Sequence, residues 1–363
     1  MKEGLNLIKV KAPGKLYIAG EYAVVNPGIP SVIVALNRFV YAEIEENNSV
    51  GTISSNQYKD KSLTFFHDNS GKLIYSDKIE AFNFIIEAIN IVEKLVIEKK
   101  IPLKLFSLHF DSDLDNTEGK KYGLGSSAAV TVATIKALQE LYQLNLKPLD
   151  IFKLAALAHY NVQGNGSLGD IAASAFTGWI SYKRFDWNWL NEFKTNHTLT
   201  DLLNATWPLL EVQQLDFPDD LELVIGWTGS PASTSKLVSK IKDYQQTNPK
   251  EYSDFVKNSS LTVNNLISSI NHNDYCGIKN ALENNRVILK ELSLASNVEI
   301  ETPLLTKLIE SVILFDGMAK TSGAGGGDCG IGIISKSNNY KELYQKWEEI
   351  GITPLNFRVY IEK

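Results

Sequence analysis

The sequence has few cysteines and no long apolar segment. Its 363 residues include only two cysteines, Cys276 and Cys329, which is too few for a disulfide-stapled fold and is typical of a reducing compartment. The longest apolar runs, SVIVAL and ESVILF, are far shorter than the roughly 20 residues of a membrane-spanning helix. The amino-terminal stretch MKEGLNLIKVKAPGK also lacks the apolar core of a secretory signal. We therefore expect a cytoplasmic protein without a membrane partner.

An excess of positive charge is missing as well. The chain has 36 lysines and arginines against 42 aspartates and glutamates, which gives a formal net charge of −6. This balance argues against a broad nucleic-acid surface, although an acidic protein can still carry a locally basic pocket. We expect a small-molecule substrate and no nucleic acid, and the sequence leaves open whether the protein is a monomer or a homodimer.

Three common catalytic signatures are absent. The sequence contains no Gly-x-x-x-x-Gly-Lys-Ser/Thr phosphate loop and no Gly-x-Ser-x-Gly hydrolase motif. Its cysteines and histidines show no zinc-ligand spacing, and none of the five histidines lies in a glycine-rich loop. These absences exclude the common phosphate-loop NTPases and argue against a hydrolase or a zinc enzyme.

The chain is long enough for two domains, and its hydrophobic fraction of 44% can fill a full core. Residues 80–100 have a helical apolar period, and partly alternating segments predict strands at 7–12, 16–25, 39–46 and 106–112. Further strands are predicted at 221–228, 330–335 and 355–362, with at least four helices between the first two. This pattern predicts a mixed sheet in the first half and an α/β sandwich of helices on a small sheet in the second half. We expect the domain junction in the loosely patterned segment that ends at Pro218, Asp219 and Asp220.

The stretch KKYGLGSSAAV combines glycines and serines at the start of a long apolar helix. Gly123 and Gly125 allow the backbone to turn tightly and to approach a ligand, and the helix start offers unpaired N–H groups and a partial positive charge. Lys120 and Lys121 add full charges. We predict a phosphate-binding loop whose members are Lys121, Gly123, Leu124, Gly125, Ser126, Ser127 and Ala128.

Two other interpretations of this loop compete with a phosphate-binding role. A dinucleotide fingerprint requires an apolar strand before the glycines and an acidic residue about 20 residues later, and both are missing here. A well-capped structural helix with no ligand remains the plain alternative, because short Gly/Ser motifs recur by accident.

A second glycine-rich loop, KTSGAGGGDCGIGIIS, begins at Lys320. So many glycines cost backbone entropy, and a run of them exposes several N–H groups that can cradle a phosphate or let a substrate lie against bare backbone. The alternative is a flexible connector between a helix and a strand. A connector needs only one or two glycines, so we predict that this loop, which includes Gly323, borders the site.

Two charged residues complete the candidate site. Pro13 and Gly14 form a turn that presents Lys15 at the head of a strand, and the polar loop GNGSLGD ends at Asp170 before a helix rich in small residues. By itself, Lys15 reads as a solvated lysine and Asp170 as a helix N-cap. Their importance depends on the other segments.

Taken together, these segments resemble the GHMP kinase superfamily. APGKLYIAGEYAVV, GLGSSAAV and KTSGAGGGDCG look like its three motifs in the expected order, and the match spans nearly the whole chain. GNGSLGD and GWTGSPASTSKLV look most like the phosphomevalonate kinases of this superfamily. Mevalonate kinases usually have a histidine where this chain has Tyr22, and they favour HGxPSGxD where it has QGNGSLGD. The related decarboxylase ranks lower, because its first motif lacks this lysine arrangement.

The resemblance implies a two-domain α+β fold. Residues 1–200 would form an ATP-binding domain like domain 2 of ribosomal protein S5, and residues 201–363 would form a ferredoxin-like domain. The implied reaction is phosphorylation of 5-phosphomevalonate by ATP in isoprenoid biosynthesis. A mevalonate kinase or another small-molecule kinase of the superfamily is the nearest alternative, and a non-catalytic nucleotide-binding sensor is an alternative of another class.

The resemblance also assigns roles to residues. Lys15 and Asp170 would be the catalytic pair, and Ser126 and Ser127 would bind Mg²⁺ beside the ATP phosphates. The residues implied for the phosphorylated substrate are Lys15, Tyr22, Ser167, Ser233, Thr234, Ser235, Lys236, Gly325, Gly326 and Gly327.

One position departs from the family pattern. Several members use a glutamate in the helix before the catalytic loop as a magnesium ligand, and this chain has His159 there. A neutral imidazole is a poor ligand for Mg²⁺, so we expect His159 to be a packing residue. A phosphate acceptor is already mostly ionised at neutral pH, because its second pKa is about 6. Asp170 is therefore expected to orient Lys15 and the metal, whereas an alcohol acceptor would require it as a general base.

Overall fold

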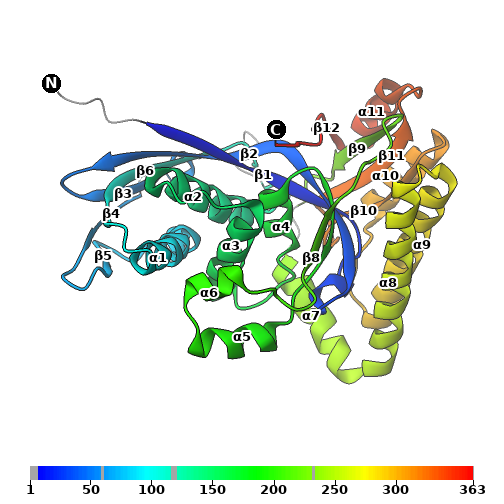
Figure 1. The fold of residues 1–363 in the computed structure, drawn as a ribbon. Coiled ribbons are helices and arrows are strands. Elements are labelled where there is room, and N and C mark those ends of the chain that lie inside the picture. Colours follow the sequence, from blue (N-terminus) through cyan, green and yellow to red (C-terminus); the bar gives the residue numbers. More distant parts are fainter. Residues whose placement is uncertain (1–6, 59–60, 116–120, 231–233, 363) are drawn as a thin grey trace.

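The computed structural model describes residues 7–58, 61–115, 121–230 and 234–362. Its larger sheet has eight strands, with β1 paired to β2 and the others in the order β5-β4-β3-β6-β2-β7-β8 (Figure 1). These strands are β1 (Ile8–Ala19), β2 (Pro30–Asn47), β3 (Gly51–Ser55), β4 (Ser62–His67), β5 (Leu73–Tyr75), β6 (Leu105–Ser112), β7 (Trp179–Lys183) and β8 (Glu211–Gln214). β2 begins as a continuous apolar run because its first half is buried on both faces.

Six helices accompany this sheet, and short 3₁₀ turns lie at Ala23–Val25, Asn56–Tyr58 and Glu80–Phe82. The helices are α1 (Asn83–Glu98), α2 (Ser126–Tyr142), α3 (Pro148–Gln163), α4 (Gly169–Phe176), α5 (Trp187–Asn196) and α6 (Leu199–Asn204). α2 and α4 pack on β1 and β2, and α1 and α3 pack against α2 (Figure 1). α2 is therefore enclosed, which agrees with the apolar residues that run nearly all round it.

The smaller sheet has four strands in the order β10-β11-β9-β12. Its elements are β9 (Leu221–Trp227), α7 (Thr234–Thr247), α8 (Pro249–Asn271), α9 (Tyr275–Ser296), α10 (Pro303–Leu314), β10 (Met318–Thr321), β11 (Cys329–Ser335), α11 (Tyr340–Glu349) and β12 (Thr353–Leu355). The order β-α-β-β-α-β is that of a ferredoxin-like unit with extra helices in its first crossover. The predicted α+β class and the four helices between the first two strands are confirmed.

The two sheets are tied into one body. One buried apolar cluster extends from β1 and β2 into β9, β10 and β11. After β12 the chain returns to the larger sheet, where the Gly178 N–H donates to the Tyr360 carbonyl at 2.7 Å. The boundary expected between residues 200 and 201 stays a prediction. Because β8 pairs with β7, we propose a boundary after Gln214.

Several details differ from the expected strands. The turn expected at Pro13 and Gly14 is a register shift inside β1, so Lys15 lies within this strand and not at its head. The predicted strand at 16–25 ends at Ala19, because Gly20 and Tyr22 have φ values of +93° and +63° that no strand contains. The strand predicted at 355–362 is reduced to β12 and a single bridge between Leu36 and Val359. The short strands β3, β4, β5, β7, β8 and β10 were not predicted, since segments of three to six residues are too short for a clear alternating pattern. No helix in the described ranges has the length and apolar character that crossing a membrane requires.

Candidate active site

A cleft of about 630 Å³ lies where the predicted motifs meet. It is bordered by the end of β1 and the turn after it, by the loop before α2, by the loop between α3 and α4, and by the loop between β10 and β11. The predicted site residues that line it are Lys15, Tyr22, Lys121, Gly123, Leu124, Gly125, Ser126, Ser127, Ser167, Asp170 and Thr234. Residues that are far apart in the sequence therefore share one cavity.

The loop before α2 presents bare backbone to this cleft. Gly123 and Gly125 have φ values of +78° and +80°, and α2 begins directly afterwards at Ser126. No side chain caps the first turn of α2. Because the first N–H groups of a helix have no intrahelical acceptor, this end of α2 is suited to an anion.

Lys15 lies against this loop. Its backbone N–H donates to the Leu124 carbonyl at 2.9 Å, and its Nζ donates to the Gly123 carbonyl at 3.2 Å. A Cβ atom added at Gly125 would lie 3.1 Å from the Lys15 Cε and 3.5 Å from the Asp170 Cβ. The predicted charged pair and the glycine loop therefore converge.

Electrostatics around Lys15 are opposed. Burial lowers the pKa of the Lys15 ammonium, while the carboxylates of Asp170 and Asp328 raise it. The ammonium loses hydration and gains anionic neighbours, and a bound phosphate would add to the second effect. Lys15 is thus a cation whose charge is compensated mainly by what lies in the cleft.

Asp170 is held by the packing of the loop that precedes it. The Tyr17 hydroxyl shares a hydrogen bond of 2.7 Å with the Ser167 hydroxyl, and the Tyr182 hydroxyl donates to the Ser167 carbonyl at 2.7 Å. These bonds fix the loop on the larger sheet. A Cβ at Gly169 would lie 2.3 Å from the Tyr17 hydroxyl, so only glycine fits immediately before Asp170. Asp170 is the second residue of α4, and its Oδ1 accepts from the Ile171 N–H at 3.0 Å.

His159 is more than a packing residue. It stacks on Phe84 with ring centroids 4.7 Å apart, as its predicted role requires, but its Nε2 also lies 3.1 Å from the Ser127 hydroxyl oxygen. Burial lowers the pKa of His159, with Asp170 acting in the opposite direction. A neutral imidazole therefore fixes one side of the Ser127 hydroxyl.

The donor set fits a magnesium ion only in combination with phosphate. Among the described residues no three His, Cys, Asp or Glu side chains are grouped to hold a metal ion. Mg²⁺ prefers six oxygen ligands and commonly keeps water and substrate phosphates among them. The hydroxyls of Ser126 and Ser127 at the cleft fit such a shared coordination, and an all-protein metal site does not.

The lining residues that sequence reasoning missed include Asp328, Cys329 and Glu21. Asp328 follows the second glycine-rich loop, and a Cβ at Gly123 would lie 2.5 Å from its carboxylate. Cys329 is buried beside it, and Glu21 precedes Tyr22 in the first motif. Their place in the sequence could have indicated them, because each of the three is adjacent to a residue or loop that the sequence analysis predicts to be in the site.

The glycines of the second loop are placed differently from those of the first. Gly323 lines the cleft, but Gly325, Gly326 and Gly327 are not among its lining residues. A Cβ at Gly325 would lie 2.2 Å from the Ile300 carbonyl oxygen, and one at Gly327 would lie 2.3 Å from that of Ser230. These glycines let two stretches of backbone meet.

Of the remaining predicted residues, those whose side chains the structure describes do not line the cleft. Lys236 is exposed on α7, and Ala128 is buried in the first turn of α2, where its small side chain keeps α2 close to its neighbours. Ser235 lies in the first turn of α7. Ser233 and Lys120 lie outside the described residues. The substrate-binding roles of these residues stay predictions.

Comparison with known proteins gives consistent results. The family models for the GHMP kinases N terminal domain and the GHMP kinases C terminal region match residues 83–178 and 266–353. A phosphomevalonate kinase from Streptomyces sp. (strain CL190) is 33% identical to this chain over 98% of both.

Two solved structures share the fold over nearly the whole chain. The Lin0012 protein from Listeria innocua is 37% identical, has a TM-score of 0.92, and matches over 99% of this chain and 100% of its own. The Streptococcus pneumoniae phosphomevalonate kinase in complex with phosphomevalonate and AMPPNP is 30% identical, with a TM-score of 0.84 and coverage of 97% and 100%.

Proposed function

Because this chain belongs to the GHMP kinase family, we propose that it phosphorylates 5-phosphomevalonate with ATP, forming 5-diphosphomevalonate and ADP. The observation that carries the proposal is the full-length match to the Streptomyces phosphomevalonate kinase, at 33% identity. The Streptococcus pneumoniae enzyme, whose complex contains phosphomevalonate and AMPPNP, supports both the acceptor and the nucleotide.

In the proposed reaction an oxygen of the acceptor phosphate attacks the γ-phosphorus of ATP. The bond between that phosphorus and the bridging oxygen of ADP breaks, and ADP leaves with the electron pair. The main obstacle is repulsion between two anionic phosphates, so catalysis depends on positioning and on fixed positive charge. Proton removal matters less, because a phosphomonoester is mostly ionised at neutral pH.

The chain supplies this positive charge at the loop before α2. The N–H groups at the start of α2 would bind the ATP phosphates, and the Lys15 ammonium would face the transferred group between Gly123 and Asp170. The Ser126 or Ser127 hydroxyl would be a ligand of a magnesium ion, which, when bound, would neutralise part of the phosphate charge. The neutral His159 would hold the Ser127 hydroxyl in one orientation.

Asp170 would act on Lys15 and on the metal shell, and not as a base. Its carboxylate raises the pKa of Lys15 and so keeps the ammonium protonated despite burial. Asp170→Asn should therefore lower kcat by roughly 10- to 100-fold and leave the acidic side of the pH–kcat profile the same as in the wild type. A pH–rate profile in which wild-type activity follows one base that the variant lacks would contradict this role.

The acceptor is tested by offering mevalonate and phosphomevalonate separately to the purified protein with ATP and Mg²⁺. We expect ADP formation with phosphomevalonate alone. ADP formation with mevalonate alone would show that the protein is a kinase with mevalonate as its acceptor. ADP formation with neither compound would favour a nucleotide-binding sensor. Lys15→Met serves as the control, because it removes the cation and leaves the glycine loop intact.

A further inference from the structure

A buried ion pair beside the cleft joins the turn after β1 to β10. Nζ of Lys320, in β10, donates to Oε1 of Glu21 at 2.5 Å, and their side chains are 1% and 2% exposed. Lys320 also donates to the Thr321 carbonyl at 2.6 Å. Burial lowers the pKa of Lys320, and the Glu21 carboxylate raises it. Buried pairs contribute little to stability compared with apolar packing, so this pair calls for another explanation.

Two more contacts join the same two segments. The Ser322 hydroxyl donates to the Tyr17 carbonyl at 2.7 Å, and the Tyr22 hydroxyl donates to the Ala324 carbonyl at 2.5 Å. Together with the Lys320 pair, these bonds use the side chains of Lys320 and Ser322 and the backbone carbonyl of Ala324. We call this set, which ties residues 17–22 to residues 320–324, the clasp.

The clasp holds an unusual backbone. Tyr22 has a φ of +63°, a conformation that an aromatic residue adopts only when its surroundings impose it. The Tyr22 side chain packs with Ala324 in a buried apolar cluster from α7, α8 and α9. The turn after β1 is thus shaped by contacts from the second half of the chain.

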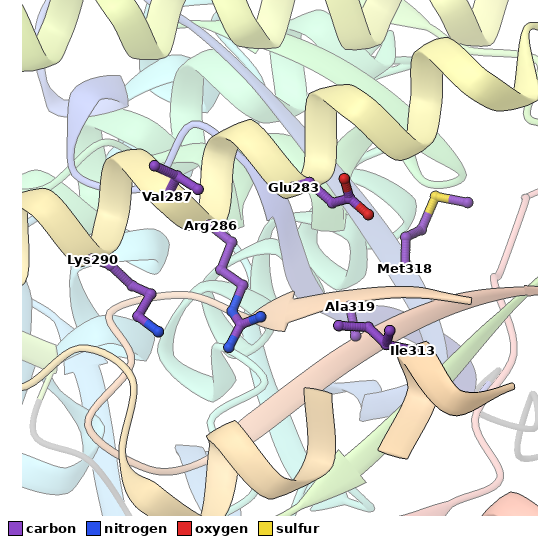
Figure 2. A pocket seen from close by; sticks show the side chains of 7 residues that line it. All are labelled: Glu283, Arg286, Val287, Lys290, Ile313, Met318 and Ala319. Carbon is purple, nitrogen blue, oxygen red and sulfur yellow. The ribbon is translucent and has the colours of Figure 1, made fainter. Parts of the chain in front are cut away.

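A second group of ion pairs lies beside β10. Figure 2 shows Arg286 and Lys290 of α9 above Ala319 of β10. Arg286 binds Glu301 through two hydrogen bonds, of 2.8 and 2.6 Å, and Lys290 lies 3.6 Å from the same carboxylate. This groove has its own ion pairs, and its Glu301 carboxylate also raises the pKa of Lys320. The control is therefore placed at Lys290, whose ammonium lies 3.6 Å from Glu301, because Arg286 keeps that carboxylate paired when Lys290 is replaced.

The clasp borders the cleft with residues from both of its segments. Glu21, Tyr22, Ser322 and Ala324 all line the cavity, and no clasp bond involves the loop at 123–127 where the ATP phosphates are proposed to bind. Resting on the proposed function, we propose that Glu21 and Lys320 are positioning residues that set the affinity for the phosphorylated acceptor. They hold the turn after β1 against the loop after β10, and neither needs to touch the substrate.

The test uses Glu21→Gln, Lys320→Met and the double variant, with Lys290→Met as the matched control. KM for phosphomevalonate, KM for ATP and kcat are measured beside the melting temperature. We expect each single variant to raise KM for phosphomevalonate about tenfold or more, to change KM for ATP less than twofold, and to lower the melting temperature. Lys290→Met makes the same chemical change at a half-exposed pair, so its constants should match those of the wild type.

The double variant keeps the proposal testable when a single variant does not fold. It leaves no unpaired buried charge, so it should regain most of the lost melting temperature while KM for phosphomevalonate stays raised. If KM for phosphomevalonate and KM for ATP in the double variant both equal the wild-type values, or both rise in parallel, the pair only supports the fold. Failure of the wild type to use phosphomevalonate would instead refute the proposed function, before any variant is compared.

Discussion

The two glycine-rich loops of this protein look alike in sequence and differ in what their glycines face. In the first, Gly123 and Gly125 border the cleft beside Lys15 and Asp170. In the second, only Gly323 borders the cleft, and Gly325 and Gly327 lie against the backbone of other segments. Positive φ values occur in both loops. Glycine density therefore indicates close approach to backbone, and the tertiary structure decides whether a ligand or another segment approaches.

The largest effect on this comparison is expected at the first loop. Lys15→Met removes the ammonium that faces the Gly123 carbonyl, and kcat should fall about 10³-fold because fixed charge at the transferred phosphate is lost. The melting temperature should change little, since Lys15 forms no salt bridge in the described structure. Steady-state kinetics and thermal unfolding of the same preparation measure both.

The same lysine predicts an alkaline limit. Burial lowers the pKa of Lys15, so it loses its proton at a lower pH than an exposed lysine, whose pKa is about 10.4. Because the protonated form is the active one, kcat/KM should decline on the alkaline side before that value. A Lys15→Arg variant that retains activity should lack this decline, and an unchanged profile would assign the limit to another group.

Gly125→Ala is expected to have the next largest effect. A Cβ there would lie 3.1 Å from the Lys15 Cε at a φ of +80°, so the new methyl group would displace the cation and strain the loop. We expect kcat/KM for ATP to fall roughly 10- to 100-fold, with a loss of about 1 kcal/mol in the free energy of unfolding. A variant with normal kinetics would mean that the loop does not hold the nucleotide.

Gly325→Ala should show the opposite balance. The added Cβ would lie 2.2 Å from the Ile300 carbonyl oxygen, so backbone has to move. The free energy of unfolding should fall by about 2 kcal/mol or more, measured by urea denaturation. The fraction that remains folded should keep its KM for ATP within a few-fold of wild type. A purely kinetic defect would place Gly325 with the first loop.

Gly323→Ala provides the smallest effect and the control for the second loop. Its φ is +71°, yet no atom lies within 4 Å of an added Cβ. Only the conformational cost applies, about 1 kcal/mol in the free energy of unfolding. A much larger loss would show that backbone strain alone, without the contact at Ile300, explains the result at Gly325.

Much of the fold followed from local pattern. The helix predicted at 80–100 corresponds to α1, and the apolar runs at 221–228 and 330–335 correspond to β9 and β11. The strand at 16–25 failed because its apolar composition hides the turn that begins at Gly20, where a Cβ would lie 2.7 Å from the Pro30 carbonyl oxygen. An apolar run indicates that residues are buried, but it does not show that they form a strand. Tyr22 and Ala23 are buried and lie outside any strand.

The candidate site divides in the same way. Gly123, Gly125, Ser126 and Ser127 were selected because a helix start beside glycines favours anions whatever surrounds it. Asp328 and Glu21 were missed, since a lone carboxylate gives no sign of what it will face. His159 was expected only to pack, and its contact with the Ser127 hydroxyl depends on how α3 lies beside α2.

The sequence by itself determined the long helices and strands and the two glycine-rich loops, because backbone propensity and apolar period are properties of neighbours along the chain. Only the tertiary structure decided which glycines face a cleft, that Lys320 meets Glu21, and that Lys15 lies between Gly123 and Asp170. Those pairings join residues up to about 300 positions apart, and only long-range packing sets such distances.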